Sequence, residues 1–311
     1  MLKDGVINID KPQGWTSHDV VAKIRGLMKV TKVGHAGTLD PMATGVLPIC
    51  FGKGTKIVSF FLDAEKTYEA IIRLGEETET QDATGRVVSS YDVPSDILEL
   101  IPGVLASFEG AYEQIPPMYS AIKIKGVPLY KTARLGVVVA REPRPVQILA
   151  IQLMGIEGRD VSFSVRCSKG TYVRTLCADI GTRLGVGGHL LSLRRTQSGM
   201  FPLGEAIEVE KFCDLYREGA WEGEVCSLNK VLRHLPAICI DDEQLWKIKE
   251  GVPIGLECLA QYDTFRRGHP IRFMDRHGDL LAVGIALLDS DEASERMGPF
   301  YKMKALLTDR S

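Results

Sequence analysis

Hydrophobic and polar residues follow two different periods in the first thirty positions of the chain. Ile7 and Ile9 share one face of residues 5–10 with the two-residue period of a β-strand, and the segment 11–14 (KPQG) predicts a turn after it. Apolar residues then recur at helical spacing over 16–28, behind a capping-box pattern, which predicts an amphipathic helix. The chain therefore begins as strand, turn and helix.

Both periods return further along the chain. We expect strands at 46–51 and 67–74, a hairpin over 146–168 and further strands in 187–209, with helices near 56–62, 94–108, 171–184 and 210–234. In the helix after Gly170, Thr171 is placed to act as the N-cap and Gly185 as the end.

Two regions differ from the rest of the chain in composition and in the elements they predict. Residues 116–145 are basic and are interrupted by prolines and two glycines, so they predict an irregular insertion rather than one regular element. From about residue 237 the chain has a short amphipathic piece, a turn at 251–253 and short strands ending near 306. This tail predicts a small, separate β-rich domain.

The loop 34–45 (GHAGTLDPMATG) is where chemistry is most plausible. Pro41 biases Asp40 away from helical geometry, and three glycines in the loop allow close approach of a ligand. Asp40 would then project from a fixed turn. A plain Asx turn, in which Asp40 bonds only nearby backbone amides, explains the same pattern.

Three other side chains have a functional and an ordinary interpretation. Arg174 falls in the first turn of its helix, where a cation opposes the helix dipole, so it either pairs with an acid or is simply solvated. Tyr68 follows the start of a strand and is either sheet packing or a surface on which a base stacks. His35 bonds its own loop, titrates or stacks on a ligand.

Composition and missing motifs exclude several classes of protein. The chain has 311 residues, of which 45% are hydrophobic and 25% charged, as in globular proteins. Its longest apolar run, 280–288, is too short to span a membrane, and the N-terminus lacks the apolar stretch of a secretory signal, so we expect a cytoplasmic protein. Seven scattered cysteines without a CxxC pair argue against zinc and disulfides. Motifs for nucleotide hydrolysis, dinucleotide binding, zinc proteolysis and serine hydrolysis are absent.

Positive charge is concentrated locally although the net charge is −2. Residues 1–60 carry a surplus of basic side chains, and residues 123–144 carry six against the single acid Glu142. The six are Lys123, Lys125, Lys131, Arg134, Arg141 and Arg144. Such a stretch is either a solvated face or a surface for nucleic acid.

Five segments resemble motifs of the bacterial TruB family of tRNA pseudouridine synthases, in the family's order. They are INIDKPQGWTS (7–17), GHAGTLDPMATGVLPICFGKGTK (34–56), KTYEAIIRLG (66–75), PPMYSAIKIKGVPLYKTAR (116–134) and CSKGTYVRTLCADIG (167–181). The tail resembles a PUA domain, a small RNA-binding β-barrel, over a shorter stretch.

The resemblance implies roles for individual residues. Asp40 matches the family's essential aspartate, Tyr68 its active-site tyrosine and Arg174 the arginine that pairs with the aspartate. His35 matches a loop histidine that contacts RNA, and Lys11, with Pro12, matches a motif that supports the catalytic loop and that we also place among the RNA-binding residues. Residues 116–145 match a thumb-like segment that clamps RNA, to which we assign four further RNA contacts: Lys123, Lys125, Arg134 and Arg141.

The resemblance also implies a fold and a reaction. It implies an α+β catalytic domain at 1–236, with a mixed, mainly antiparallel sheet and the thumb insertion, and a PUA-like β-barrel at 237–311. The expected reaction isomerises uridine 55 in the T loop of tRNA to pseudouridine after the nucleotide is flipped out. The T-arm stem-loop is the expected partner, and no cofactor, metal, membrane, guide RNA or obligatory protein partner is expected for what should be a monomer.

Two alternatives to a stand-alone enzyme stay open at this point. The first is an RNA-binding chaperone that refolds tRNA and whose catalysis is secondary. The second is a relative that depends on a guide RNA, against which the insertion at 116–145 and the isoelectric point of about 6.3 both argue. Release of tritium from C5 of uridine would separate catalysis from binding.

Overall fold

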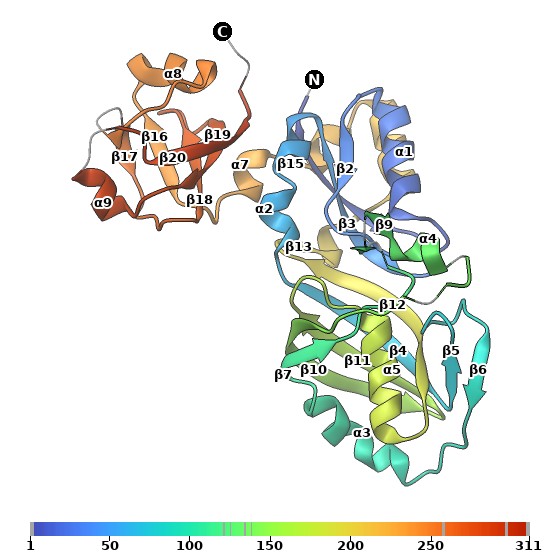
Figure 1. Ribbon diagram of the computed structural model, residues 1–311. Coiled ribbons are helices and arrows are strands. Elements are labelled where there is room, and N and C mark those ends of the chain that lie inside the picture. Colours follow the sequence, from blue (N-terminus) through green and yellow to red (C-terminus); the bar gives the residue numbers. More distant parts are fainter. Residues whose placement is uncertain are drawn as a thin grey trace.

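The computed structural model describes residues 3–120, 122–124, 126–133, 135–137, 139–256, 259–295 and 298–308. Two sheets of very different size organise these residues (Figure 1). The larger sheet and its helices come from the chain before residue 237, and the smaller sheet comes from the chain from residue 237 onward. No helix among the described residues is long and apolar enough to cross a membrane.

The larger sheet has eleven strands in the described residues, with the main order β14-β1-β3-β12-β4-β11-β10-β7. The strands are β1 (Gly5–Lys11), β2 (Val33–His35), β3 (Thr44–Phe51), β4 (Lys66–Leu74), β7 (Gly110–Gln114), β10 (Arg144–Glu157), β11 (Asp160–Cys167), β12 (Gly188–Ser198), β13 (Phe201–Pro202), β14 (Ile207–Glu208) and β15 (Val225–Cys226). Most neighbours are antiparallel, whereas β1 with β14 and β3 with β12 are parallel. The expected mixed, mainly antiparallel α+β fold is confirmed.

Two groups of helices cover this sheet, and the helices after residue 237 pack with the smaller sheet instead. The described helices are α1 (Ser17–Met28), α2 (Ser59–Leu62), α3 (Ile97–Ala106), α4 (Leu129–Ala133), α5 (Val173–Leu184), α6 (Val209–Glu218), α7 (Leu228–Val231), α8 (Leu245–Glu250) and α9 (Ser290–Ser294), with short 3₁₀ helices at Gly52–Lys56, Leu203–Glu205, Trp221–Glu224 and Asp242–Gln244. In Figure 1, α3 and α5 lie together beside β10, β11 and β4, whereas α1 lies at the other end of the sheet, near β2 and β3. Apolar faces of α1 and α5 belong to the same buried cluster as β1, β3, β4 and β11.

The elements with the clearest hydrophobic period form where the sequence predicts them. The helix at Ser17–Met28 begins at the N-cap Thr16, and Asp19 completes the capping box. The hairpin over 146–168 is the pair β10 and β11. One detail differs: the N-cap of α5 is Tyr172, and the Thr171 hydroxyl donates to the Ser168 carbonyl instead of capping the helix.

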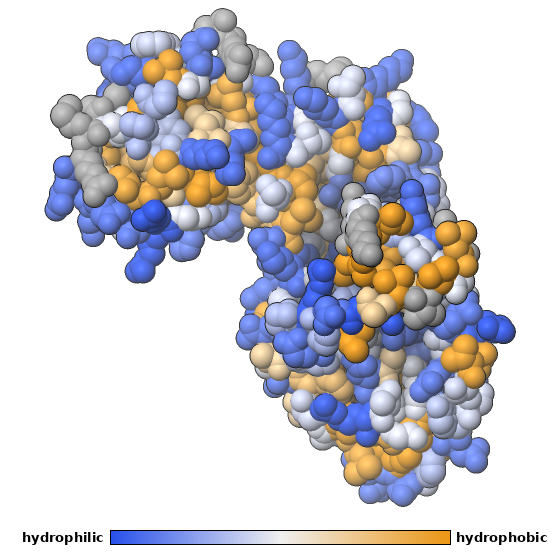
Figure 2. Space-filling view, in the orientation of Figure 1, coloured by the Kyte–Doolittle hydropathy of each residue, from blue (hydrophilic) through white to orange (hydrophobic). Residues whose placement is uncertain are grey.

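The insertion at 116–145 folds into short pieces, as its prolines and glycines predict. It holds β8 (Lys123–Ile124) paired with β9 (Val127–Pro128), then α4. Val127, Leu135 and Val137 are exposed there, and hydrophobic residues cover the surface around β9 and α4 (Figure 2). The insertion therefore presents an apolar surface as well as basic residues.

The smaller sheet has the order β17-β16-β18-β19-β20 and its own buried cluster. Its strands are β16 (Ala237–Ile240), β17 (Leu259–Tyr262), β18 (Pro270–Met274), β19 (Leu280–Ala286) and β20 (Tyr301–Leu306). In the part of the chain that the structure describes, the edge strands β17 and β20 do not pair, so the expected β-barrel is wrong as a closed barrel and the sheet is open. A third, mixed cluster and a 2.7 Å bond from Lys56 Nζ to the Leu306 carbonyl join it to the larger sheet.

Candidate active site

A cavity of about 310 Å³ lies beside strands β4 and β12 of the larger sheet. Its walls come from the loop between β2 and β3, from β4 and β12, from the start of α5 and from the beginning of the insertion. Asp40, Tyr68 and Arg174 all line it, although they are far apart in the sequence. The three residues singled out for chemistry therefore share one cavity.

The join between β3 and β12 shapes the loop that carries Asp40. The two strands pair through Arg194 with Thr44 and through Arg195 with Gly45. Gly45 has a φ of +100°, and a Cβ atom there would lie 2.2 Å from the Arg195 carbonyl oxygen. Only glycine fits this close approach of the two backbones.

Arg174 is the centre of a charged cluster in the cavity. Its Nη2 atom lies 2.8 Å from Asp40 Oδ2 and donates to the Tyr119 carbonyl at 2.9 Å. Its Nη1 atom lies 3.4 Å from Asp82 Oδ2. The side chains of Arg174 and Asp82 are 7% and 5% exposed, whereas that of Asp40 is 36% exposed. Asp40 is thus the member of the cluster that a ligand can reach.

Opposing effects act on the charge of Asp40. Burial raises the pKa of its carboxyl group, Arg174 lowers it, Asp82 raises it and Lys11 lowers it, and the net pKa is above the ordinary aspartate value. Arg174 favours the ionised form of Asp40, but burial has the larger effect on the pKa. Without the arginine the carboxylate would be still harder to ionise.

Hydrogen bonds from the turn after β1 and from the first residue of α1 fix the Asp40 loop. The buried Ser17 hydroxyl accepts from the Leu39 N–H at 2.9 Å and donates to the Leu39 carbonyl at 3.1 Å. On the other side of Asp40, the Pro41 carbonyl accepts from the Gly14 N–H at 2.8 Å. Asp40 is therefore held from both neighbours, which makes its position rigid.

Lys11 stands behind this loop. It is completely buried, and its Nζ atom donates to the carbonyls of Pro12 at 2.9 Å, Trp15 at 2.6 Å and Pro41 at 3.4 Å. Burial lowers the pKa of its ammonium group to about 8. The enclosed ammonium group with its three carbonyl partners suits the expected support of the loop, and the RNA contact assigned to Lys11 stays a prediction.

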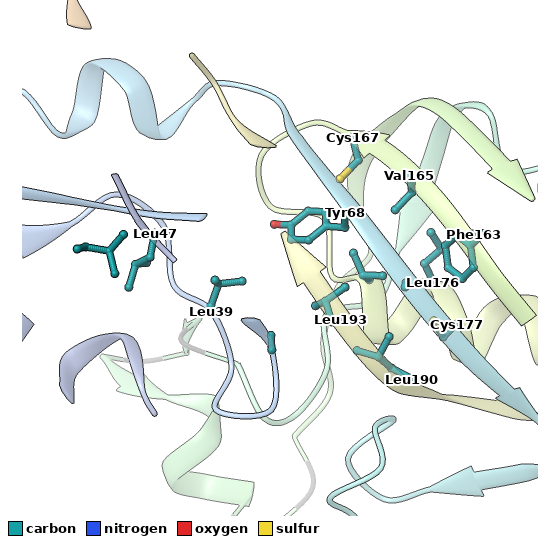
Figure 3. Packing of buried hydrophobic residues seen from close by; sticks show 14 of the residues in the cluster. Leu39, Leu47, Tyr68, Phe163, Val165, Cys167, Leu176, Cys177, Leu190 and Leu193 are labelled. Atoms are coloured by element: carbon teal, nitrogen blue, oxygen red, sulfur yellow. The ribbon is translucent and has the colours of Figure 1, made fainter. Parts of the chain in front are cut away.

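Tyr68 forms the apolar wall of the cavity. Figure 3 shows its hydroxyl end directed toward the side of Leu39 and away from Phe163 and Leu176. Burial raises the pKa of its phenol, so the hydroxyl is neutral near pH 7. A neutral ring suits stacking on a base better than it suits accepting a proton.

Sequence reasoning assigned no role to three cations of the cavity wall, Arg195, Lys66 and Lys169, of which the first two are buried. Arg195 is 1% exposed and donates from Nε to the Val46 carbonyl at 2.7 Å and from Nη2 to the Gly37 carbonyl at 3.1 Å. The Lys66 Nζ atom donates to the Leu62 carbonyl at 2.5 Å and to the Ala64 carbonyl at 2.6 Å, and burial lowers its pKa to about 8. Arg195 lies outside the five motif-like segments, and Lys66 opens the segment 66–75 without an expected role, because the burial and partners of both residues come from the tertiary structure.

The remaining predicted residues lie outside this cavity or outside the described chain. His35 is in β2, and its ring meets the His18 ring edge-on, with 5.9 Å between the ring centroids. Burial lowers the pKa of the His35 imidazole below the ordinary histidine value. Arg141 donates to the Pro116 carbonyl at 3.0 Å, which ties the two ends of the insertion together. Lys125 and Arg134 lie outside the described residues, and only the backbone of Lys123 is described, in β8.

The donor set of the cavity offers no metal site. Among the described residues, no group of three or more histidine, cysteine, aspartate or glutamate side chains lies close enough together to hold a metal ion. The cavity chemistry that the structure does show is one reachable carboxylate, its arginine partner and an aromatic wall.

Comparison with known families decides where this site belongs. Residues 25–173 match the N-terminal domain of TruB family pseudouridylate synthases, and residues 174–237 match the C-terminal domain of tRNA pseudouridylate synthase B. The chain belongs to the TruB family. The first match contains Asp40, Tyr68 and Asp82, and Arg174 opens the second.

TruB-family relatives are similar over almost the whole chain. A protein of Syntrophotalea carbinolica, named tRNA pseudouridine synthase B, is 41% identical over 97% of this chain and 97% of its own length. A protein of Pseudomonas fluorescens with the same name is 48% identical over 94% of this chain and 95% of its own length. Among solved structures, a chain from the crystal structure of a Cbf5-Nop10-Gar1 complex has a TM-score of 0.79 and 32% identity, covering 99% of this chain and 86% of that one.

Proposed function

We propose that this TruB-family chain is a tRNA pseudouridine synthase that acts on uridine 55 in the T loop. Full-length relatives carry the name tRNA pseudouridine synthase B, and they match this chain over the residues that build the cavity. The observation that carries the proposal is the partly exposed Asp40 carboxylate, held 2.8 Å from Arg174 at the edge of a nucleotide-sized cavity.

The reaction needs few groups from the protein. The N1–C1′ bond of uridine breaks, the freed uracil turns, C5 bonds to C1′, the C5 proton leaves to solvent and N1 takes up a proton, so the product is an isomer of the substrate. No electron acceptor or second substrate enters this balance. The protein must supply an anionic oxygen near the sugar, a surface for the base and exclusion of water.

We assign these tasks to the residues of the cavity. Asp40 supplies the anionic oxygen; attack at C1′, attack at C6 and removal of a ribose proton all use that same atom. Arg174 keeps the oxygen ionised against the effect of burial. Tyr68 provides the face on which the flipped uracil stacks, which offsets part of the few kcal/mol that unstacking costs.

We assign RNA binding outside the cavity to two regions. The basic and apolar insertion at 116–145 would clamp the T-arm stem-loop, and His35 would contact the RNA beside the vacated base position. Residues 237–311 would form a PUA-like RNA-binding domain, which their separate sheet and separate buried cluster support. We propose that the chain acts as a monomer, without guide RNA or protein subunits.

The direct test uses the purified chain alone with a T-arm stem-loop tritiated at C5 of its uridines. Multiple-turnover release of tritium, lost when uridine 55 is replaced by cytidine, is the expected result. Tight binding of the stem-loop without release of tritium would contradict the proposal and favour the RNA chaperone. Release that depends on an added guide RNA would contradict stand-alone action.

A further inference from the structure

Strand β7 ends at Gln114, and this side chain is bonded to the start of α5. Gln114 is 1% exposed. Its Oε1 atom accepts from the Tyr172 N–H at 2.8 Å, and its Nε2 atom donates to the Tyr172 carbonyl at 3.1 Å. A side-chain amide thus pairs with both backbone groups of one residue, as a neighbouring β-strand would.

The residue held in this way begins the helix that carries Arg174. Tyr172 is the N-cap of α5, and no side chain caps the helix there. The Tyr172 carbonyl also accepts the helical bond from the Leu176 N–H at 3.0 Å. Arg174 lies two residues further on, so the position of its guanidinium depends on the orientation of this first turn.

Gln114 also lies just before the insertion at 116–145. The chain leaves β7 directly after Gln114 and reaches Tyr119, whose carbonyl accepts from Arg174 Nη2 at 2.9 Å. Gln114 and Tyr119 therefore bond to α5 at Tyr172 and Arg174, on either side of Val173. The start of the insertion and the start of the helix form one hydrogen-bonded unit beside the cavity.

We propose that Gln114 is a positioning residue of the active site, which sets the distance between Arg174 and Asp40 by holding the backbone of Tyr172. This inference rests on the proposed function and concerns the same site. Gln114 does not itself line the cavity and is not a catalytic residue. Its effect must reach the reaction through Arg174, which gives the proposal a distinctive consequence.

The consequence is a change in kcat and in its pH dependence. Gln114→Met keeps the approximate shape of the side chain and removes both bonds to Tyr172. Because a misplacement of about 1 Å at a reacting centre can cost about a hundredfold in rate, we expect kcat to fall at least about tenfold. KM for the T-arm stem-loop should stay within about twofold, since the RNA surface is unchanged. The acid limb of kcat should move to higher pH, because Arg174 then lowers the pKa of Asp40 less.

Tyr112→Phe is the matched control. Tyr112 lies in the same strand, and its hydroxyl bonds to Asp179 further along the same helix and accepts from Gln114 Nε2 at 3.2 Å. The variant loosens the same strand–helix contact and removes this third bond of Gln114, but it leaves the two bonds from Gln114 to Tyr172 in place. We expect both variants to lose thermal stability, while kcat of Tyr112→Phe stays within about twofold of the wild type and its acid limb does not move.

The experiment measures tritium release, melting temperature and kcat against pH for the wild type and both variants. Equal losses of kcat in the two variants, or an unmoved acid limb in Gln114→Met, would overturn the inference. If Gln114→Met does not fold, Gln114→Glu replaces it, since it keeps the acceptor for the Tyr172 N–H, and the same two criteria apply. A wild type without tritium release would overturn the proposed function itself, whereas an active wild type with a neutral Gln114→Met overturns only this inference.

Discussion

Asp40 carries its charge in surroundings that oppose it. Its carboxylate is buried enough to raise the pKa and exposed enough to meet a ligand, and Arg174 is the main favourable partner. Arg174 is in turn shared between Asp40, Asp82 and the Tyr119 carbonyl. The arginine is therefore fixed on one side by groups that do not move with the substrate, and this leaves one defined geometry for Asp40.

The charge of Asp40 predicts the acid limb of the activity. The reaction needs the ionised form, and the pKa of Asp40 is raised in the folded protein, so activity falls as the pH falls through that raised value. We expect the midpoint of the acid limb of kcat above the value of about 3.9 for a free aspartate. RNA binding measured over the same range is the control and should stay level through the limb. A midpoint at or below 3.9 would show that burial does not govern this carboxyl group.

Arg174→Lys keeps the positive charge but loses the planar fork that reaches three acceptors. A hydrogen bond to a charged group contributes about 1.5–3 kcal/mol, so we expect kcat to fall by roughly ten- to a hundredfold. Arg194→Lys is the control, because Arg194 pairs with Asp10 at 2.7 Å and does not line the cavity. Unchanged kcat in Arg174→Lys would remove the pairing with Asp40 from the account.

At this scale the sequence predicts the residues of the reaction better than those that hold them. Asp40, Tyr68 and Arg174 lie in motifs, and the structure places all three on one cavity. Asp82 and Arg195 could be noticed only as charges, because what marks them is burial beside particular partners from distant strands. The residues next to Asp82 and Arg195 in the sequence do not indicate which distant residues they contact.

Among the elements, the loop from Ala36 to Ala43 is the one whose shape the reaction depends on. It is attached to β1 through Pro41, to α1 through Ser17 and to β12 through Arg195. Three different elements thus fix a segment with no regular structure of its own. This explains how a glycine-rich loop can present a carboxylate with a defined position.

Ser17→Ala tests this attachment. The change leaves the N–H and carbonyl of Leu39 without the buried Ser17 hydroxyl, which costs about 1–3 kcal/mol, and we expect a drop in kcat of about tenfold or more as the Asp40 loop loosens. Thr16→Ala is the matched control, because it removes only the helix cap next door, at about 1 kcal/mol. Equal kcat values in the two variants, measured by tritium release, would show that the bond to Leu39 does not matter.

Element boundaries were predictable only where local rules decide them. The capping box at Thr16 marks the start of α1, and the structure begins the helix there. The start of α5 was misplaced at Thr171, because the group that satisfies the backbone of Tyr172 is Gln114, 58 residues away. Where the sequence predicts a β-barrel in the tail, the described strands form an open sheet, since closure depends on pairing between strands far apart in the chain.

The whole molecule has two bodies arranged at an angle, with the insertion on the larger one (Figure 1). The smaller sheet packs against the larger body through an apolar cluster and through the bond from Lys56 to the Leu306 carbonyl (Figure 2). The net charge of −2 does not reveal an RNA-binding protein. The local surplus over 123–144 is the sequence feature on which the RNA-binding proposal for the insertion depends.

Removal of this local charge should weaken RNA binding in a salt-dependent way. The variant replaces three insertion residues by alanine: Lys123, Lys125 and Arg134. Each lost phosphate contact should reduce the slope of log affinity against log salt concentration by about 1 and weaken binding of the T-arm stem-loop. A control variant removes Lys23, Lys29 and Lys211 instead and should keep the slope. An unaltered slope in the insertion variant would exclude those residues from the phosphate contacts.

Comparison of the wild type with Asp40→Asn on the same tritiated T-arm stem-loop shows directly whether the negative charge of Asp40 drives the reaction. The substitution keeps the size of the side chain and removes its negative charge. We predict loss of tritium release to the background rate, with affinity for the stem-loop within about twofold of the wild type, because the RNA surface is unchanged. Multiple turnover by Asp40→Asn at a rate near that of the wild type would contradict the account.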